Sequence, residues 1–319
     1  ICYYAITHLK AKKQTMVLQS LGEAYLKRST DARVSLHGYL VGVGMTLLPT
    51  VLACSILTSN NYSNSFPWQQ LLCGCLSAGL FAALCRWIVL PVSSYPNYWE
   101  NAKRALFLGW AFSSGTLLAV YSRDYWTFGV YICYLSFFHW SEYWVTAVTN
   151  PATLRLSSYM LDHSPEYHLA ALISWAEFWL EALLVPWLKS YSLPIATGLA
   201  MCTAGELFRK LAMITAGRNF NHVVEHKKRT DHVLVTSGVY SWVRHPAYTG
   251  WFAWAIGTQL LLCNPVSIVG YTLASWRFFR ERINEEERLL INFFNQAYLD
   301  YQRTTWSGVP FVRGYFVRV

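Results

Sequence analysis

The sequence predicts an all-α integral membrane protein with about eight transmembrane helices. Of its 319 residues, 54% are hydrophobic and only 13% are charged. A chain this apolar has more hydrophobic surface than one soluble core can bury. Long apolar stretches recur along it, and nearly all its basic residues fall on one side if each stretch is a span. Lipid is therefore the expected solvent for much of the surface.

The apolar stretches define the expected elements in order. Six of them are long enough to cross about 30 Å of hydrocarbon as single helices. They cover residues 34–57, 71–92, 105–121, 126–148, 169–188 and 193–215. A seventh stretch, 248–279, is too long for one span and is interrupted by Asn264 and Pro265. Because proline lacks a backbone donor and disfavours helix in the residue before it, this stretch is expected to form a tight hairpin of two helices.

The basic residues set the expected orientation. With a cytosolic N-terminus, every Lys and Arg except Arg123 and Lys189 falls on the cytosolic side of these eight spans. Both termini are then cytosolic. Anionic lipid headgroups account for the net charge of +9 without a nucleic acid partner. The eight cysteines form no CxxC pair and mostly fall in or beside apolar stretches, so no metal site is expected from them.

Three regions are expected along the chain. Residues 1–30 form an N-terminal cytosolic extension, 31–216 hold the first six transmembrane helices, and 217–319 form a catalytic region. That last region contains a polar loop, the hairpin 248–279, and a C-terminal cytosolic helix beginning near Arg280. Because the hairpin starts and ends on the cytosolic face, it brings the two polar stretches together. A polar cofactor can be held between them while a lipid reaches the same place from the bilayer.

The polar stretches contain an ordered set of motifs. Gly238-Val239-Tyr240 precedes Arg244-His245-Pro246-Ala247-Tyr248-Thr249-Gly250-Trp251, and the acidic run Arg282-Ile283-Asn284-Glu285-Glu286-Glu287 follows the hairpin. With this order and spacing, the chain from about Asp31 to its C-terminus resembles the isoprenylcysteine carboxyl methyltransferase family of the endoplasmic reticulum. Longer similarity at residues 139–143 and 217–224 supports that family. Part of the pattern is shared with phospholipid N-methyltransferases and some sterol reductases.

The resemblance implies a cofactor, a reaction and a location. The implied activity is methylation by S-adenosylmethionine of the C-terminal α-carboxylate of prenylated CaaX proteins of the small GTPase type, in the endoplasmic reticulum membrane. It also implies that the cofactor contacts Glu225, His232, Val233, Leu234, Val235, Tyr240, His245, Pro246, Ala247, Tyr248 and Glu286. Arg282 faces the acceptor, and Arg282 and Glu286 are the expected catalytic residues. Glu225 stands where the family pattern has Gln, and Ala247 where Ser is more usual.

The residue types suit this chemistry on physical grounds. A sulfonium cation needs a carboxylate or aromatic faces, which Glu286, Tyr240 and Tyr248 offer. A free α-carboxylate, with a pKa near about 3.5, is already ionised and needs no general base. Arg282 can hold one carboxylate oxygen by a charge-assisted hydrogen bond and leave the other to attack. Because Glu286 lies four residues after Arg282, the two share a helix face as a possible ion pair.

Several residues leave more than one interpretation open. Glu285 and Glu287 suit either the site or a solvated helix face, and His245 suits a structural role better than acid–base catalysis. Glu142 and Glu206 lie within apolar stretches, where hydrogen bonding between helices is the favoured interpretation. The histidines 163, 168, 222 and 226 superficially resemble the ligands of a membrane di-iron oxygenase.

Two further activities compete with the favoured one. A phospholipid N-methyltransferase of the same superfamily differs in its acceptor. A transporter or a non-catalytic lipid-binding protein is the other alternative. Transporters commonly show duplicated halves, and no such repeat is visible in this sequence. Membrane lipid and prenylated proteins are thus the expected partners.

Overall fold

The computed structural model describes residues 30–59, 97–162 and 164–316, and within these ranges the chain forms helices joined by loops, without a strand. The long helices are α2 (Thr30–Ser59), α4 (Tyr98–Tyr121), α5 (Trp126–Thr149), α6 (Pro165–Leu184), α7 (Ser192–Ala216), α8 (Pro246–Leu261) and α9 (Pro265–Phe294). The short α10 (Gln296–Thr304) follows. These helices match the predicted apolar stretches, although α6 ends at Leu184, before the end of the stretch 169–188. The stretch 71–92 lies outside the described residues, as does nearly all of the extension 1–30.

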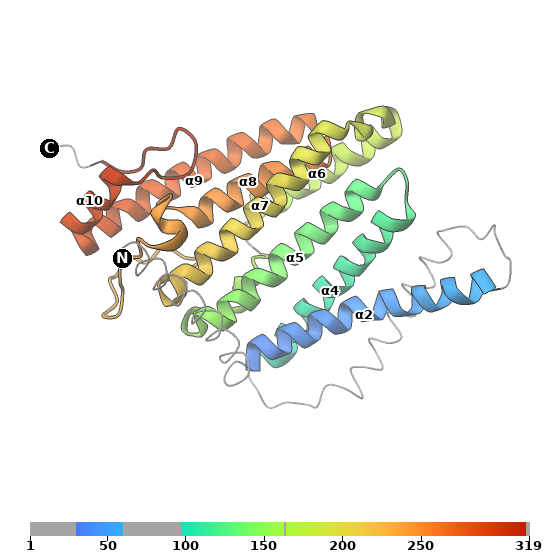
Figure 1. Ribbon diagram of the computed structural model, residues 1–319, viewed down its shortest axis with the longest axis horizontal. Helices are drawn as coiled ribbons and strands as arrows, with labels where there is room; N and C mark the ends of the chain where they lie inside the picture. The colour runs from blue at the N-terminus through green and yellow to red at the C-terminus, as the bar shows by residue number, and fades with distance from the viewer. Residues whose placement is uncertain (1–29, 60–96, 163, 317–319) are drawn as a thin grey trace, which may run out of the picture.

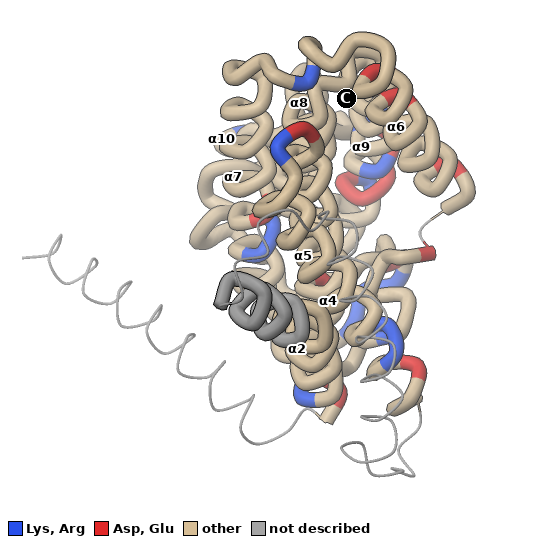
Figure 2. The backbone as a smooth tube through the Cα atoms, turned by 90° about the vertical axis from the view of Figure 1, so that its right-hand side faces the viewer, with Lys and Arg blue, Asp and Glu red and all other residues tan. Residues whose placement is uncertain are grey.

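The helices pack side by side into one bundle, with α2, α4 and α5 on one side and α7, α8 and α9 on the other (Figure 1). Figure 2 shows most of the described backbone free of charged residues, with the acidic and basic positions in short groups. Within the described ranges, no helix combines the length and the apolar composition needed to cross a membrane. The number of spans stays a prediction.

Small residues allow the closest helix contacts. A Cβ atom on Gly109 of α4 would lie 2.0 Å from the backbone oxygen of Tyr39 on α2. A Cβ atom on Gly250 of α8 would lie 2.5 Å from the backbone oxygen of Gly205 on α7. Backbones this close leave no room for a side chain, so glycine at these positions fixes the distance between paired helices. Aromatic stacking fills the space beside them, as between Phe138 and Trp254, whose ring centroids lie 4.3 Å apart.

The hairpin predicted from Asn264 and Pro265 is confirmed, since α8 ends at Leu261 and α9 begins at Pro265. Charged side chains from elsewhere in the chain cap both helix ends. Lys189 donates to the carbonyls of Leu262 and Cys263 at the end of α8, and Glu177 accepts from the first free backbone N–H groups of α9. A cation at a helix C-terminus and an anion at an N-terminus each stabilise the helix.

The prediction of a separate helix beginning near Arg280 is wrong. Helix α9 continues without interruption from Pro265 to Phe294, so Arg280 lies in its middle. The sequence between 271 and 294 contains neither Gly nor Pro, so nothing breaks the helix where the apolar stretch ends. It ends before Asn295, whose φ is +49°. Consequently α9 belongs to both the apolar bundle and the polar region.

Candidate cofactor and acceptor site

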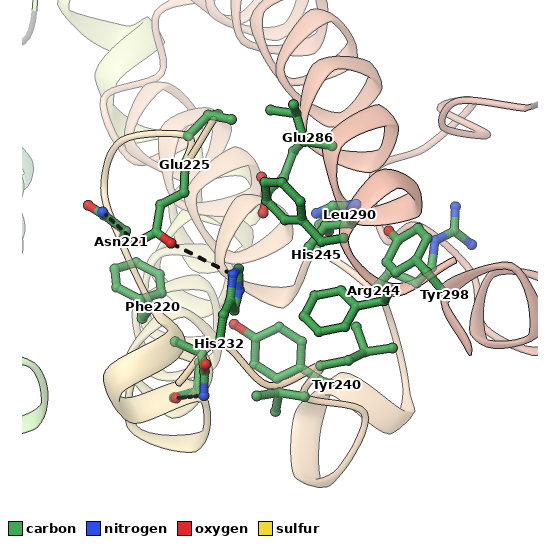
Figure 3. Close-up of a pocket in the computed structure, with 18 of the residues that line it drawn as sticks. Phe220, Asn221, Glu225, His232, Tyr240, Arg244, His245, Glu286, Leu290 and Tyr298 are labelled. Carbon is green, nitrogen blue, oxygen red and sulfur yellow. Dashed lines mark hydrogen bonds and ion pairs between the residues drawn. The ribbon is translucent and has the colours of Figure 1, made fainter. Parts of the chain in front are cut away.

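A pocket lies where the segment between α7 and α8 meets α9 and α10 (Figure 3). It encloses about 920 Å³, with the open solvent at its mouth included. Apart from Pro246, which begins α8, every residue expected to contact the cofactor lines it. These residues are Glu225, His232, Val233, Leu234, Val235, Tyr240, His245, Ala247, Tyr248 and Glu286. The structure thus brings together the two polar stretches that flank the hairpin.

One wall of the pocket has polar atoms without hydrogen-bond partners. The Oε1 atom of Glu225 accepts from the side chains of Asn221 and Arg229, but its Oε2 atom is buried without a hydrogen bond. The Nδ1 atom of His232 is likewise buried without a hydrogen bond, 3.7 Å from that oxygen. Figure 3 shows these two side chains directed toward one another. Buried polar atoms are rarely left unpaired, so this wall is suited to a polar ligand.

Burial controls the protonation of this wall. It lowers the pKa of His232, and the nearby cations Arg229 and Lys228 lower it further, although Glu225 opposes them. The imidazole is therefore neutral near neutral pH and offers one donor and one acceptor nitrogen. Burial also raises the pKa of Tyr240, which stays a neutral phenol. His232 and Tyr240 therefore offer the pocket hydrogen bonds from neutral groups.

Aromatic and aliphatic side chains complete the pocket. Tyr240 belongs to the short turn Gly238–Ser241, and its backbone oxygen accepts a hydrogen bond from Tyr301 of α10. Leu289, Leu290, Phe293 and Phe294 of α9 line the pocket as well. Aromatic and aliphatic groups of this kind can pack against a flat ring.

The expected catalytic residues meet at Tyr248. The hydroxyl of Tyr248 donates to Oε2 of Glu286 at 2.5 Å, and Nε of Arg282 donates to that hydroxyl at 3.2 Å. Arg282 also donates to the backbone oxygen of His222 at 2.7 Å. Among the described residues, Arg282 and Glu286 are therefore joined through Tyr248 and not by the direct ion pair that their spacing suggested. Arg282 stands beside the pocket without lining it.

Glu287 has a role that the sequence did not reveal. Its side chain is 0% exposed and pairs with Nε of Arg244 at 2.7 Å and Nε2 of His245 at 3.0 Å. Its other oxygen accepts from Gln302 and from the backbone of Tyr315. The solvated-face interpretation is therefore wrong for Glu287. No local sequence signal points to it, because its partners lie on other elements.

His245 is held in place by that carboxylate. Its Nε2 atom faces Glu287, and its ring stacks on Tyr248 with the centroids 5.6 Å apart. Burial alone would raise the pKa of Glu287, but the hydrogen bond from His245 and the charge of Arg244 outweigh it and lower the pKa. These contacts fit the structural role expected for His245.

A second buried cluster lies beneath the site. Arg209 of α7 forms two 2.7 Å hydrogen bonds with Glu142 of α5, and His222 donates to the same carboxylate at 2.8 Å. Lys210 also pairs with it. Another Arg209 nitrogen donates to the backbone oxygen of Ala247 at 3.1 Å. The cluster therefore connects α5 and α7 to the loop and to the start of α8.

The polar residues within apolar stretches join helices, as expected. Glu142 binds Arg209 across α5 and α7, and Glu206 of α7 accepts from Ser141 of α5 at 2.9 Å. Of the histidines considered as iron ligands, His222 contacts Glu142 and His226 lies 3.7 Å from Glu285. His168 contacts the backbone oxygen of Leu161 instead, and position 163 lies outside the described residues.

The fold and the pocket define a helical protein with a polar-ligand site at one end of its bundle. A sequence model of the isoprenylcysteine carboxyl methyltransferase family matches residues 198–292. The protein-S-isoprenylcysteine O-methyltransferase of Xenopus laevis is 49% identical over 286 residues, covering 89% of this chain and 97% of the relative. The Homo sapiens enzyme of the same name is 48% identical, covering 89% and 94%. The chain belongs to the isoprenylcysteine carboxyl methyltransferase family.

The fold agrees with that assignment. The solved structure of the eukaryotic intramembrane Ras methyltransferase ICMT superposes with a TM-score of 0.79 at 38% identity. The match covers 91% of this chain and all of the solved one. Likeness to an intramembrane enzyme over this length supports membrane association of the chain.

Proposed function

We propose that this chain transfers a methyl group from S-adenosylmethionine to the α-carboxylate of a C-terminal prenylated cysteine. The observation that carries the proposal is one hydrogen-bonded chain that joins Glu286 and Tyr248 of the pocket lining to Arg282 beside the pocket. It puts a cation for an acceptor carboxylate beside a carboxylate for a cationic cofactor. The names and the extent of the similar relatives support the same reaction.

The pocket fits S-adenosylmethionine by its chemistry. The unpaired atoms of Glu225 and His232 suit the cofactor's ammonium or hydroxyl groups, and the phenylalanines of α9 suit its adenine. Glu286 and Tyr248 supply negative charge and an aromatic face for a sulfonium ion. When bound, the cofactor supplies an electrophilic methyl group. Glu225 keeps the acceptor oxygen that the expected Gln would provide.

The residues around the acceptor orient and desolvate it. Arg282 binds one oxygen of the acceptor carboxylate and leaves the other free, while Tyr248 and the His222 carbonyl fix its guanidinium. Transfer forms an oxygen–carbon bond, breaks a sulfur–carbon bond and moves no proton. Because two opposite charges become neutral groups, water opposes the reaction and a closed pocket favours it. In-line placement of the reacting atoms is then the main contribution of the protein.

We further propose that the chain lies in the endoplasmic reticulum membrane with eight spans. Both termini and the pocket are then on the cytosolic side. Large apolar side chains point away from the bundle on α6 and α7, as expected of surfaces that contact lipid. They include Leu172, Leu180, Leu183, Leu184, Leu193 and Leu207. A prenyl chain can reach the site sideways from the bilayer while the protein to which it is attached stays in the cytosol.

Methyl transfer by the purified chain in lipid tests the proposal. Labelled S-adenosylmethionine is offered with a farnesylated cysteine analogue and, separately, with phosphatidylethanolamine. We expect base-labile product on the prenylcysteine. Arg282→Lys keeps the charge but loses the planar fork, so KM for the acceptor should rise about 10- to 100-fold, the value of a charge-assisted hydrogen bond. Arg288→Lys, at an exposed position on the same helix, is the matched control.

Glu286→Gln tests the cofactor side of the site. It should weaken cofactor binding and transfer, whereas Glu285→Gln should change neither. Label on the phospholipid amine instead would keep the superfamily and overturn the acceptor. Failure to transfer to either acceptor by a chain that binds the cofactor would reject both activities.

A further inference from the structure

Phe311 is the most exposed large apolar side chain in the described part of the protein. Its side chain is 92% exposed, and its φ of +62° is in the left-handed region that bulky residues rarely adopt. An exposed phenylalanine ring gains no hydrophobic stabilisation, and the left-handed backbone at this residue costs conformational energy. Such a residue is explained most simply by a contact outside the chain.

The loop that presents Phe311 is fixed on both sides. Val309 and Val312 are buried with Phe279 and Ile283 of α9, so the side chains flanking the tip anchor it. The indole of Trp276 donates to the backbone oxygen of Pro310 at 2.8 Å.

A second tie lies just past the tip, where Arg244 donates to the backbone oxygen of Arg313 at 2.9 Å. Figure 1 shows the chain after α10 returning along α9. The tip therefore projects from a rigid base.

Helix α9 indicates the depth of this tip in a membrane. Val266, Val269 and Leu273 are exposed by 69%, 59% and 63%, and Trp276 and Arg280 continue the series at helical spacing. This stripe passes from aliphatic to aromatic to cationic, which is the order from hydrocarbon through the interface to the phosphates. Since Trp276 holds Pro310, Phe311 lies at the interfacial level of the stripe.

Charge completes the match to a lipid surface. The guanidinium of Arg280 lies 5.4 Å from the Trp276 ring, and the side chain of Arg313 is exposed next to the tip. Two cations beside an apolar wedge match an anionic phospholipid interface better than an apolar protein groove.

We propose that the loop 309–313 inserts Phe311 into the cytosolic leaflet, with Arg280 and Arg313 binding anionic headgroups. This contact anchors the C-terminal segment that Glu287 ties to the pocket. Such anchoring does not depend on which acceptor the chain methylates.

A fluorescent amino acid at position 311 tests the insertion. The full chain is placed in lipid nanodiscs that contain phospholipids spin-labelled near the headgroup, and quenching of the emission is measured. The matched control has the same probe at Arg303 of α10, whose side chain is 73% exposed. The neighbouring Gln302 contacts Glu287, which lies about 16 Å further along α9 than Trp276. Arg303 is therefore expected to lie further from the membrane than Phe311. We expect a blue shift and several times more quenching at 311.

The outcomes separate insertion from its alternatives. Emission at 311 that is quenched no more than at 303 overturns the proposal, and so does a blue shift without quenching, which would mean burial against protein. Adding phosphatidylserine to phosphatidylcholine should increase quenching, and the increase should disappear in the double variant Arg280→Gln, Arg313→Gln. If adding phosphatidylserine left the quenching unchanged, the anionic headgroup would be rejected as the partner. The probe at Arg313, on the same loop, provides a second test if the 311 variant fails to fold.

Discussion

Three consecutive glutamates of α9 occupy three different environments. Glu285 is partly exposed beside His226, Glu286 lines the pocket, and Glu287 is buried against Arg244. Successive residues of a helix point in directions about 100° apart, so one face cannot hold all three. Sequence similarity identified Glu286, but the burial of Glu287 depends on α10 and the C-terminal segment packing over it.

Glu287→Gln should lower the free energy of unfolding by about 3 kcal/mol, because it leaves the buried Arg244 without its counter-charge. Thermal unfolding of the purified variant in detergent measures the loss. Glu285→Gln is the control and should stay within about 0.5 kcal/mol of the parent chain. Equal stability of the two variants would contradict the structural role of Glu287.

Acid should destabilise the chain partly through Glu287. Its pKa is lowered in the folded state, so its contribution is fully present above the ordinary carboxyl value of 4.5 and is lost as pH falls through the lower folded value. Stability measured from pH 6 down to about pH 3 should fall more steeply in the parent chain than in Glu287→Gln. Parallel curves would mean that other carboxylates account for the acid sensitivity.

At the scale of elements, the loop between α7 and α8 is bound to both α5 and α9. The ring of His222 binds Glu142 of α5, and its backbone oxygen accepts from Arg282 of α9. His222 thereby acts on Arg282 through the main chain, as a positioning residue. His226, four residues later, lies at the exposed edge of the same loop.

His222→Ala should raise KM for the prenylcysteine about tenfold, because losing one hydrogen bond of about 1.4 kcal/mol frees the carbonyl that orients Arg282. Cofactor affinity should change little. His222→Gln places an amide N–H near the position of Nε2 and should restore most of the acceptor affinity. His226→Ala is the control. If His222→Ala weakened cofactor and acceptor binding equally, the loop would be generally disordered and the positioning role would be lost.

Local sequence predicts those features of the helices that depend on neighbouring residues. Asn264 and Pro265 predicted the hairpin because proline acts on its immediate neighbours. Lys189 was placed outside because it falls between two predicted spans, but the sequence did not reveal that it is a buried cap of α8. The carbonyls that it caps lie more than seventy residues further along the chain. The continuation of α9 past Arg280 was missed for another reason. The change from apolar to polar residues indicates where the expected surroundings change from lipid to water. A helix can cross that boundary without a break.

At the scale of the molecule, the order of the described helices could be predicted from the apolar stretches, and the motifs predicted that the polar stretches flanking the hairpin come together. The Arg282–Tyr248–Glu286 connection could not, since Arg282 and Glu286 share a helix and only the packing of α8 inserts Tyr248 between them. The same limit applies to Glu142, whose partners come from α7 and the following loop. Pairings between distant elements depend on helix rotation, which a single sequence does not specify.

Because the pocket is built from the loop before α8, from α9 and from α10, a ligand in it should stabilise the whole chain. S-adenosylhomocysteine at a hundred times its Kd should add about 2.7 kcal/mol to the free energy of unfolding. Glu225→Gln keeps the acceptor oxygen and should keep most of this gain, whereas Glu225→Ala should lose about 1 kcal/mol or more of it at the same ligand concentration.

Arg282→Lys provides the matched control for this measurement. Arg282 stands beside the pocket without lining it, so its substitution should leave ligand stabilisation intact while acceptor KM rises. Thermal unfolding with and without ligand separates the two effects. Equal loss of stabilisation in Glu225→Ala and Arg282→Lys would show that one group of residues binds both cofactor and acceptor, against the division proposed for this site. Retention in Glu225→Ala would instead remove the unpaired Oε2 atom from the cofactor contacts.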